Sequence, residues 1–154
     1  MITDNKMLHI KAVAEECYRI AKEEYRLNQN EAEKAYAIGF VHDIGYAFAD
    51  ENSSHPLKGM EMLNSVFGVM CFEVGAHGNP DTKYHSQYLD ILNKADLSVD
   101  AMGCKVGPIA RLKDIEDRYG KESRQYKNAK RLVDTLFTRE EILNACNEDM
   151  ERPL

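Results

Sequence analysis

The chain has 154 residues, of which 44% are hydrophobic and 30% charged, and its formal net charge is −6 at pH 7. This length suits a single globular domain with a core of its own. The acidic balance argues against a nucleic-acid polymer as partner, and no apolar run approaches the roughly 18 residues that a membrane span requires. Four scattered cysteines without a Cys-x-x-Cys pair indicate free thiols in a reducing cytoplasm rather than a disulfide framework or a zinc ribbon.

Helical periodicity dominates the sequence, and no segment shows the alternation that is typical of a strand. The first predicted helix carries an apolar stripe at 3.6-residue spacing, with His9 at its rim. Asn30 and Glu33 have the spacing of a capping box for the second helix, which stops at Gly45. In chain order the predicted helices cover residues 7–25, 30–43, a segment opening at 55–56, 69–76, 86–102, 108–120, 126–137 and 138–147, with a loop over 50–54 and a fraying tail over 148–154.

Proline and capping residues mark the later helix boundaries. Pro56 and Pro108 stand where proline is favoured, in the first turn of a helix. Thr138 with Glu141 has the capping-box spacing at the start of the last helix. The predicted buried face of the third helix consists of Met60, Leu63 and Val66 or Phe67. Without a repeat or a linker, these elements predict one all-α domain.

Several histidines and aspartates point toward the interior of this predicted domain. One inward histidine is most often a core residue with a satisfied hydrogen bond, but inward or rim imidazoles and carboxylates on different helices are how helical bundles build metal sites. Burying such groups is costly unless they are paired or bind a metal. Three of the candidates continue apolar rows of their own helices: His42 after Ala35 and Ile38, His77 after Met70 and Val74, and Asp96 after Leu92.

Taken in order, these residues resemble the ligand pattern of the HD-domain superfamily of metal-dependent phosphohydrolases. The apolar run that leads into His42-Asp43-Ile44-Gly45, the helix opening His55-Pro56-x-x-Gly59 and the phrase Asn93-Lys94-Ala95-Asp96 carry the resemblance, which covers residues 9–96. It implies a single-domain helical bundle of about seven to eight helices over 1–154, with a motif-bearing core at 7–103 and C-terminal helices at 108–148.

The resemblance also implies a ligand set. In the family's minimal site one divalent metal ion is held by residues that correspond here to His9, His42, Asp43 and Asp96. Members with two further histidines, placed as His55 and His77 are here, belong to a two-metal subgroup in which the aspartate that corresponds to Asp43 bridges both ions. Imidazole and carboxylate ligands leave Fe, Mn, Co, Ni, Zn and Mg open as the metal.

The function implied is hydrolysis, by metal-activated water, of a phosphate ester or anhydride in a nucleotide or another small phosphorylated metabolite. Asp43 would act at the reacting centre, and His85 could protonate the leaving group. Many relatives have a lysine three residues after the aspartate, where this chain has Tyr46. The candidates for binding the substrate phosphate are therefore Lys58, Lys94 and Arg111, the last from a segment, 105–131, with nine basic and four acidic residues.

Two other functions stay open at this point. A minority of the superfamily holds two irons with a similar ligand set and is an oxygenase, and some degenerate members are non-catalytic modules that bind a nucleotide. No membrane is expected as a partner, and a homodimer remains open.

Overall fold

The computed structural model describes residues 2–48 and 54–150, with side chains described as far as residue 144. Over these ranges the chain forms eight α-helices and one short 3-10 helix, with a single isolated bridge between Val99 and Lys105 in place of any strand. The prediction of a single-domain, all-α fold is therefore confirmed. The elements are α1 (Asp4–Glu23), α2 (Gln29–Val41), η1 (Ile44–Ala47), α3 (His55–Phe67), α4 (Phe72–Ala76), α5 (Gln87–Asp96), α6 (Pro108–Tyr119), α7 (Arg124–Leu136) and α8 (Arg139–Met150).

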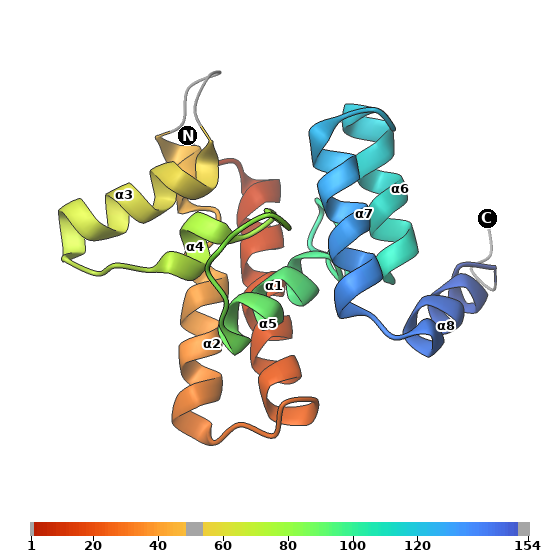
Figure 1. The fold of residues 1–154 in the computed structure, drawn as a ribbon, viewed down its shortest axis with the longest axis horizontal. Coiled ribbons are helices and arrows are strands. Elements are labelled where there is room, and N and C mark those ends of the chain that lie inside the picture. The colour runs from red at the N-terminus through yellow and green to blue at the C-terminus, as the bar shows by residue number, and fades with distance from the viewer. Residues whose placement is uncertain (1, 49–53, 151–154) are drawn as a thin grey trace.

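Two apolar clusters hold these helices together. Helices α1 and α2 lie side by side, and α5 packs against both; the apolar faces of these helices form the larger cluster, to which α4 also contributes (Figure 1). The α6–α7 hairpin stands beside this group and has a smaller cluster of its own. The buried members of the smaller cluster are Leu97, Leu112, Ile115, Ala129, Leu132 and Val133.

The first two helices begin earlier than the sequence pattern suggests. Thr3 caps α1, so this helix starts at Asp4 rather than at residue 7. The capping box of α2 is formed by Asn28 and Glu31, which exchange hydrogen bonds of 3.0 and 3.1 Å, and not by Asn30 and Glu33. Both pairs have the same spacing, and the chain uses the earlier one, directly after residues 24–27, of which Glu24, Tyr25 and Leu27 donate backbone hydrogen bonds to carbonyls of α1.

The middle of the chain shows three differences from the predicted elements. Val66 and Phe67 are 59% and 67% exposed, so the expected buried face of α3 is reduced to Gly59 and Leu63. Helix α3 contacts α4 and η1 near its start, and Gly68 ends it in the left-handed conformation (φ 63°). Helix α4 begins only at Phe72, and α5 ends at Asp96 because residues 97–106 form turns closed by backbone bonds such as Val106 N–H to Ser98 O.

The C-terminal boundaries follow their sequence signals closely. Gly107 and Gly120 flank α6, and Thr138 and Glu141 form the expected capping box, with bonds of 2.7 and 3.2 Å. The predicted loop 50–54 lies mostly outside the described residues, as does the end of the tail, 151–154, whereas 148–150 still belong to α8. Within the described part of the chain, no helix has both the length and the apolar character to cross a membrane.

Candidate metal centre

Six histidine and aspartate side chains from five segments converge beside the larger apolar cluster. His9 comes from α1, and His42-Asp43 directly follows α2. The remaining three stand at helix ends: His55 is the first residue of α3, His77 follows α4, and Asp96 is the last residue of α5. Four of the six are buried, namely His9, His42, Asp43 and His77, whereas His55 and Asp96 are half-buried. Helix ends thus bring the ligands together, while the helix bodies form the core.

A close contact between two backbone segments brings His55 to Asp43. Gly45 in η1 lies against the first turn of α3, where a Cβ atom on residue 45 would stand 1.8 Å from the carbonyl oxygen of His55. The same Cβ would lie 2.7 Å from the amide nitrogen of Gly59. Only glycine allows this approach. The two glycines of the sequence motif therefore let η1 rest directly on α3.

The three buried imidazoles share one hydrogen-bonding arrangement. The Nδ1 atoms of His9, His42 and His77 lie 2.8, 2.6 and 2.7 Å from the backbone carbonyls of Asp100, Gly39 and Val74. Because a carbonyl can only accept, each Nδ1 carries the hydrogen and each neutral ring has its lone pair on Nε2. All three Nε2 atoms face Asp43. This is how proteins orient histidines that bind metals.

The two oxygens of Asp43 serve two separate groups of nitrogen atoms. Oδ2 lies 3.3 Å from His42 Nε2 and 3.8 Å from His9 Nε2. Oδ1 lies 3.3 Å from His55 Nε2 and 3.7 Å from His77 Nε2. Within the described chain, these are the two sets of ligand atoms close enough together to hold a metal ion, and Asp43 belongs to both. We call them the first trio (His9, His42, Asp43) and the second trio (Asp43, His55, His77).

Asp96 approaches the first trio from the side of His9. Its Oδ1 atom lies 3.1 Å from His9 Nε2 and 3.2 Å from the Nη2 atom of Arg111. Arg111 also donates through Nε to the Asp96 carbonyl oxygen, at 3.2 Å, and through Nη1 to Asp114, at 2.6 Å. Arg111 on α6 therefore fixes the carboxylate at the end of α5.

One unpartnered atom indicates that the first trio fits a bound cation. His42 Nε2 is fully buried and is the one buried side-chain nitrogen or oxygen, among the described residues, that has no hydrogen-bond partner. Leaving such an atom without a partner is costly. An imidazole lone pair next to a carboxylate is a donor set that suits a divalent transition metal.

The electrostatics of the cluster favour positive charge at its centre. Burial raises the pKa of Asp43, but His42, His55 and His77 outweigh this and hold the pKa well below its usual range. Burial likewise raises the pKa of Asp96, and His9 and Arg111 more than offset it, so that this pKa is also lowered. Both carboxylates are therefore ionised at neutral pH and available to a cation.

The sequence contains four further candidates for binding substrate or transferring a proton, and the structure places one of them beside the cluster of histidines and aspartates. Arg111 lines the cavity, described below, that also contains five of the six ligands. Lys58 pairs with Glu61 at 2.8 Å on the exposed side of α3, and Lys94 pairs with Glu24 and Glu141 at 2.6 and 2.5 Å, which ties α8 to the core. His85 is exposed in the segment before α5. Of these four, only Arg111 is among the residues that line the cavity.

Sequence reasoning assigned no role to several residues that the structure brings to the cavity, among them Lys6, Asn93, Arg118 and Arg124. Lys6 places its Nζ atom 2.8 Å from Asp43 Oδ2. Asn93 accepts a hydrogen bond from the backbone N–H of Gly78 at 2.8 Å, which positions the segment after His77. Arg118 and Arg124 come from the α6–α7 hairpin. The basic character of segment 105–131 was the one sequence signal for the two arginines, and nothing in the helical pattern marked Lys6.

A cavity of about 630 Å3 opens directly above the two trios. One side is formed by five of the six ligands, all but the buried His42, together with Lys6 and Tyr46. Tyr46 stacks on the imidazole of His55 with the ring centroids 4.0 Å apart, and Arg111 of α6 also lines the cavity. The other side is formed by the α6–α7 hairpin. Its polar members are Arg118, Arg124, Gln125 and Asn128, and its apolar members are Ile115, Ala129 and Leu132.

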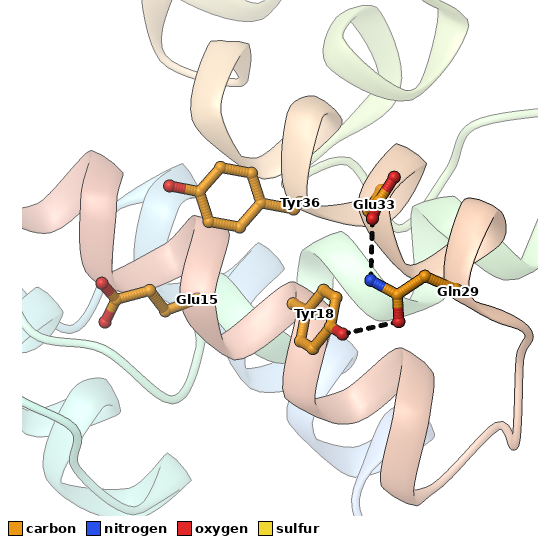
Figure 2. A pocket seen from close by; sticks show the side chains of 5 residues that line it. All are labelled: Glu15, Tyr18, Gln29, Glu33 and Tyr36. Atoms are coloured by element: carbon orange, nitrogen blue, oxygen red, sulfur yellow. Dashed lines mark hydrogen bonds between the residues drawn. The ribbon is translucent and has the colours of Figure 1, made fainter.

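A second hollow, of about 380 Å3, lies between α1 and α2 (Figure 2). Glu15, Tyr18 and Tyr36 line it together with Gln29 and Glu33, which a hydrogen bond of 2.7 Å joins. No basic side chain is among these residues, so this hollow does not suit an anionic ligand.

The helical fold and the histidine and aspartate cluster are compatible with an HD-like domain. Comparison of the chain with protein-family models, with curated proteins and with solved structures gives no match in any of the three.

Proposed function

We propose that this protein is a metal-dependent phosphohydrolase of the HD-like type. The observation that carries the proposal is the position of Asp43, whose two carboxylate oxygens each face a separate pair of imidazole nitrogens at the floor of the cavity. A carboxylate shared in this way is the arrangement expected of a bridging ligand between two divalent ions. Such a pair of ions, when bound, screens the charge of a phosphate group and supplies hydroxide near neutral pH.

The side chains of the cavity suit a phosphorylated substrate. Arg111, Arg118, Arg124 and Lys6 give the wall a cationic character, and a phosphate attracts guanidinium groups more strongly than a neutral ligand would. Arg111 is engaged with Asp96 and Asp114, and Arg118 with Asp114, so both are held in place for recognition.

The rest of the cavity indicates a small molecule with a non-phosphate part. Its volume of about 630 Å3 falls within the range of small-molecule sites, roughly 300–1,000 Å3. The apolar side chains of Ile115, Ala129 and Leu132 stand beside the amides of Gln125 and Asn128. This pairing of an apolar wall with hydrogen-bonding groups suits a nucleoside or a comparable metabolite.

The test is metal-dependent hydrolysis by the full chain. Protein stripped with a chelator and reloaded with Mn2+, Fe2+, Co2+, Ni2+, Zn2+ or Mg2+ should release phosphate from a generic aryl phosphate and from members of a nucleotide panel. Asp43→Asn should lower this rate by more than about 100-fold, because it weakens both trios at once. Asp81→Asn is the matched control, since Asp81 is exposed and outside the cavity. Equal rates for Asp43→Asn and Asp81→Asn would contradict the proposal.

The same assay under argon separates hydrolysis from oxygen-dependent chemistry. A hydrolase keeps its full rate without oxygen, whereas iron-loaded protein that hydrolyses no ester but takes up oxygen when substrate is added would support the di-iron oxygenase. Metal-loaded protein that neither hydrolyses an ester nor takes up oxygen would support the third candidate, the non-catalytic binding module.

A further inference from the structure

Lys6 lies in the first turn of α1, next to the exposed Asp4 and Asn5, yet its side chain reaches the cluster of histidines and aspartates. Its Nζ atom donates to Asp43 Oδ2 at 2.8 Å and lies 4.1 Å from the centre of the Tyr46 ring. The side chain is 27% exposed and lines the cavity. Lys6 is the one lysine among the lining residues. It therefore reaches the floor of the cavity while its stem remains at the rim.

The oxygen that Lys6 contacts is the one that belongs to the first trio. Oδ2 of Asp43 also faces His42 Nε2 and His9 Nε2, at 3.3 and 3.8 Å. An ammonium group and a divalent cation on the same carboxylate oxygen repel each other strongly at such short range. Cation binding by the first trio and the contact between Lys6 and Asp43 are therefore in competition.

Lys6 has a second neighbour, the Tyr46 ring, that does not depend on its contact with Asp43. Its flexible four-carbon stem and the face of Tyr46 hold the ammonium beside the floor of the cavity. There it stands next to the place where an anion bound to the trios would lie. Two of the other cations of the wall, Arg111 and Arg118, are less free to move, because both are engaged with Asp114.

We propose that Lys6 is the residue that binds the substrate phosphate beside the metal centre, and that in metal-free protein its ammonium is held by Asp43. This rests on the proposed function for the identity of the anion. It predicts two effects of opposite sign for a single substitution. Removing the ammonium should strengthen metal binding, because a competitor is lost, and weaken phosphate binding, because a partner is lost.

The test measures both affinities by titration calorimetry on the full chain. In Lys6→Met the Kd for Mn2+ should fall about tenfold, and the Kd of the Mn2+-loaded protein for inorganic phosphate should rise about 10- to 100-fold. Lys11→Met is the matched control: it makes the same charge change on an exposed position of the same helix and should move neither Kd more than about twofold. Lys6→Arg, which keeps the charge, should retain phosphate binding.

The outcomes separate this proposal from the proposed function. An unchanged Mn2+ affinity in Lys6→Met, or equal phosphate binding by Lys6→Met and the wild type, would overturn the role of Lys6 while leaving hydrolysis intact. If Lys6→Met shows both expected shifts but the wild type hydrolyses no ester, the result supports the role of Lys6 and counts against the phosphohydrolase. A metal-loaded wild type that does not bind phosphate overturns both.

Discussion

The imidazoles of His55 and His77 approach each other to 3.3 Å between their Nε2 atoms, although one opens α3 and the other follows α4. Both nitrogens also face Asp43 Oδ1. Because the hydrogen of His77 lies on Nδ1, beside the carbonyl of Val74, its Nε2 is an acceptor: it can accept the Nε2 hydrogen of His55 or, with the other His55 tautomer, bind one metal ion together with it. This relationship defines the second trio and leads to the first prediction.

Removing either histidine of the second trio should remove one metal ion and leave the other. For His55→Ala and His77→Ala we expect the bound metal, measured by elemental analysis after gel filtration, to fall from about two ions per chain to about one. His85→Ala is the control for metal content, because His85 is exposed and belongs to neither trio. Full metal content in both variants would show that the second trio binds no ion.

The glycine contact between η1 and α3 should be as important as the ligands themselves. Gly45→Ala would push a Cβ atom into the His55 carbonyl, and the two segments must separate to relieve the overlap. We expect the free energy of unfolding to fall by about 3 kcal/mol and the metal of the second trio to be lost, as judged by denaturant titration and elemental analysis.

Gly75→Ala serves as its control. A Cβ atom at residue 75 meets only the flexible side chain of Met60, which can move aside. The loss of stability and of metal should therefore be much smaller than in Gly45→Ala. Similar effects in both variants would argue that the contact with His55 has no special role.

Metal binding should stabilise the fold, because the ligands come from five segments that must be assembled together. At a metal concentration 100 times Kd, each site contributes about 2.7 kcal/mol. For a chain of this size that corresponds to a rise in Tm of roughly 5–10 °C. Calorimetry with and without a chelator checks this, and Asp43→Asn should show no rise. An equal rise in Asp43→Asn would mean that the metal binds elsewhere.

Glu16 should make the stability depend on pH in a defined direction. Burial raises the pKa of this carboxyl, but Arg19 at 2.7 Å and Lys105 at 3.2 Å more than offset it, so the pKa lies below its usual 4.5. A lowered folded-state pKa stabilises the protein above the unfolded-state pKa, and this contribution is lost as the pH falls through the folded-state value. Glu16→Gln should therefore lower the free energy of unfolding by about 1 kcal/mol at pH 7.

The difference between Glu16→Gln and the wild type should vanish in acid, below the lowered pKa of Glu16. Urea titrations across the pH range measure it directly. A difference that stays constant from neutral pH into acid would show that the glutamine acts through packing rather than through the lost charge.

Helix α3 offers a matched pair of substitutions that tests the observed burial. Leu63 is 6% exposed, and Leu63→Ala should lower the free energy of unfolding by about 2–4 kcal/mol. Phe67 is 67% exposed, and Phe67→Ser should change it by no more than about 0.5 kcal/mol. Urea denaturation of both variants measures the contrast, and a large loss in Phe67→Ser would mean that another surface covers this residue.

The contrast on α3 shows what helical periodicity can and cannot predict. The spacing of Leu63, Val66 and Phe67 correctly identifies one apolar face of a helix. Whether that face is covered depends on where the neighbouring helices end, and the close contacts of η1 and α4 with α3 lie in its first half, at His55, Gly59 and Met60. For the same reason Met70, which shares a row with the buried Val74, is exposed in the segment before α4.

The histidine ligands of the candidate site could be predicted from the sequence more readily than the basic residues of the cavity wall. His42 continues the row of the buried Ala35 and Ile38, so its direction follows from the helix period. His77 lies just beyond the end of α4 in extended backbone, so its direction agrees with the prediction although the helix does not reach it. Lys6 precedes the apolar stripe of α1 and reaches Asp43 across 37 positions of sequence, a contact that no local pattern encodes. Arg118 and Arg124 reach the cavity only because the α6–α7 hairpin docks beside α5.

The two apolar clusters have a consequence for how substrate preference could change. The trios are anchored on α1 to α4, whereas most of the opposite wall is built on the separately packed α6–α7 hairpin. Exchanging residues 108–136 for another hairpin that keeps the arginine at position 111 would therefore redraw the selectivity of the pocket without disturbing the chemistry at its floor. In the proposed phosphohydrolase, substrate specificity and metal binding would thus depend on different parts of the chain.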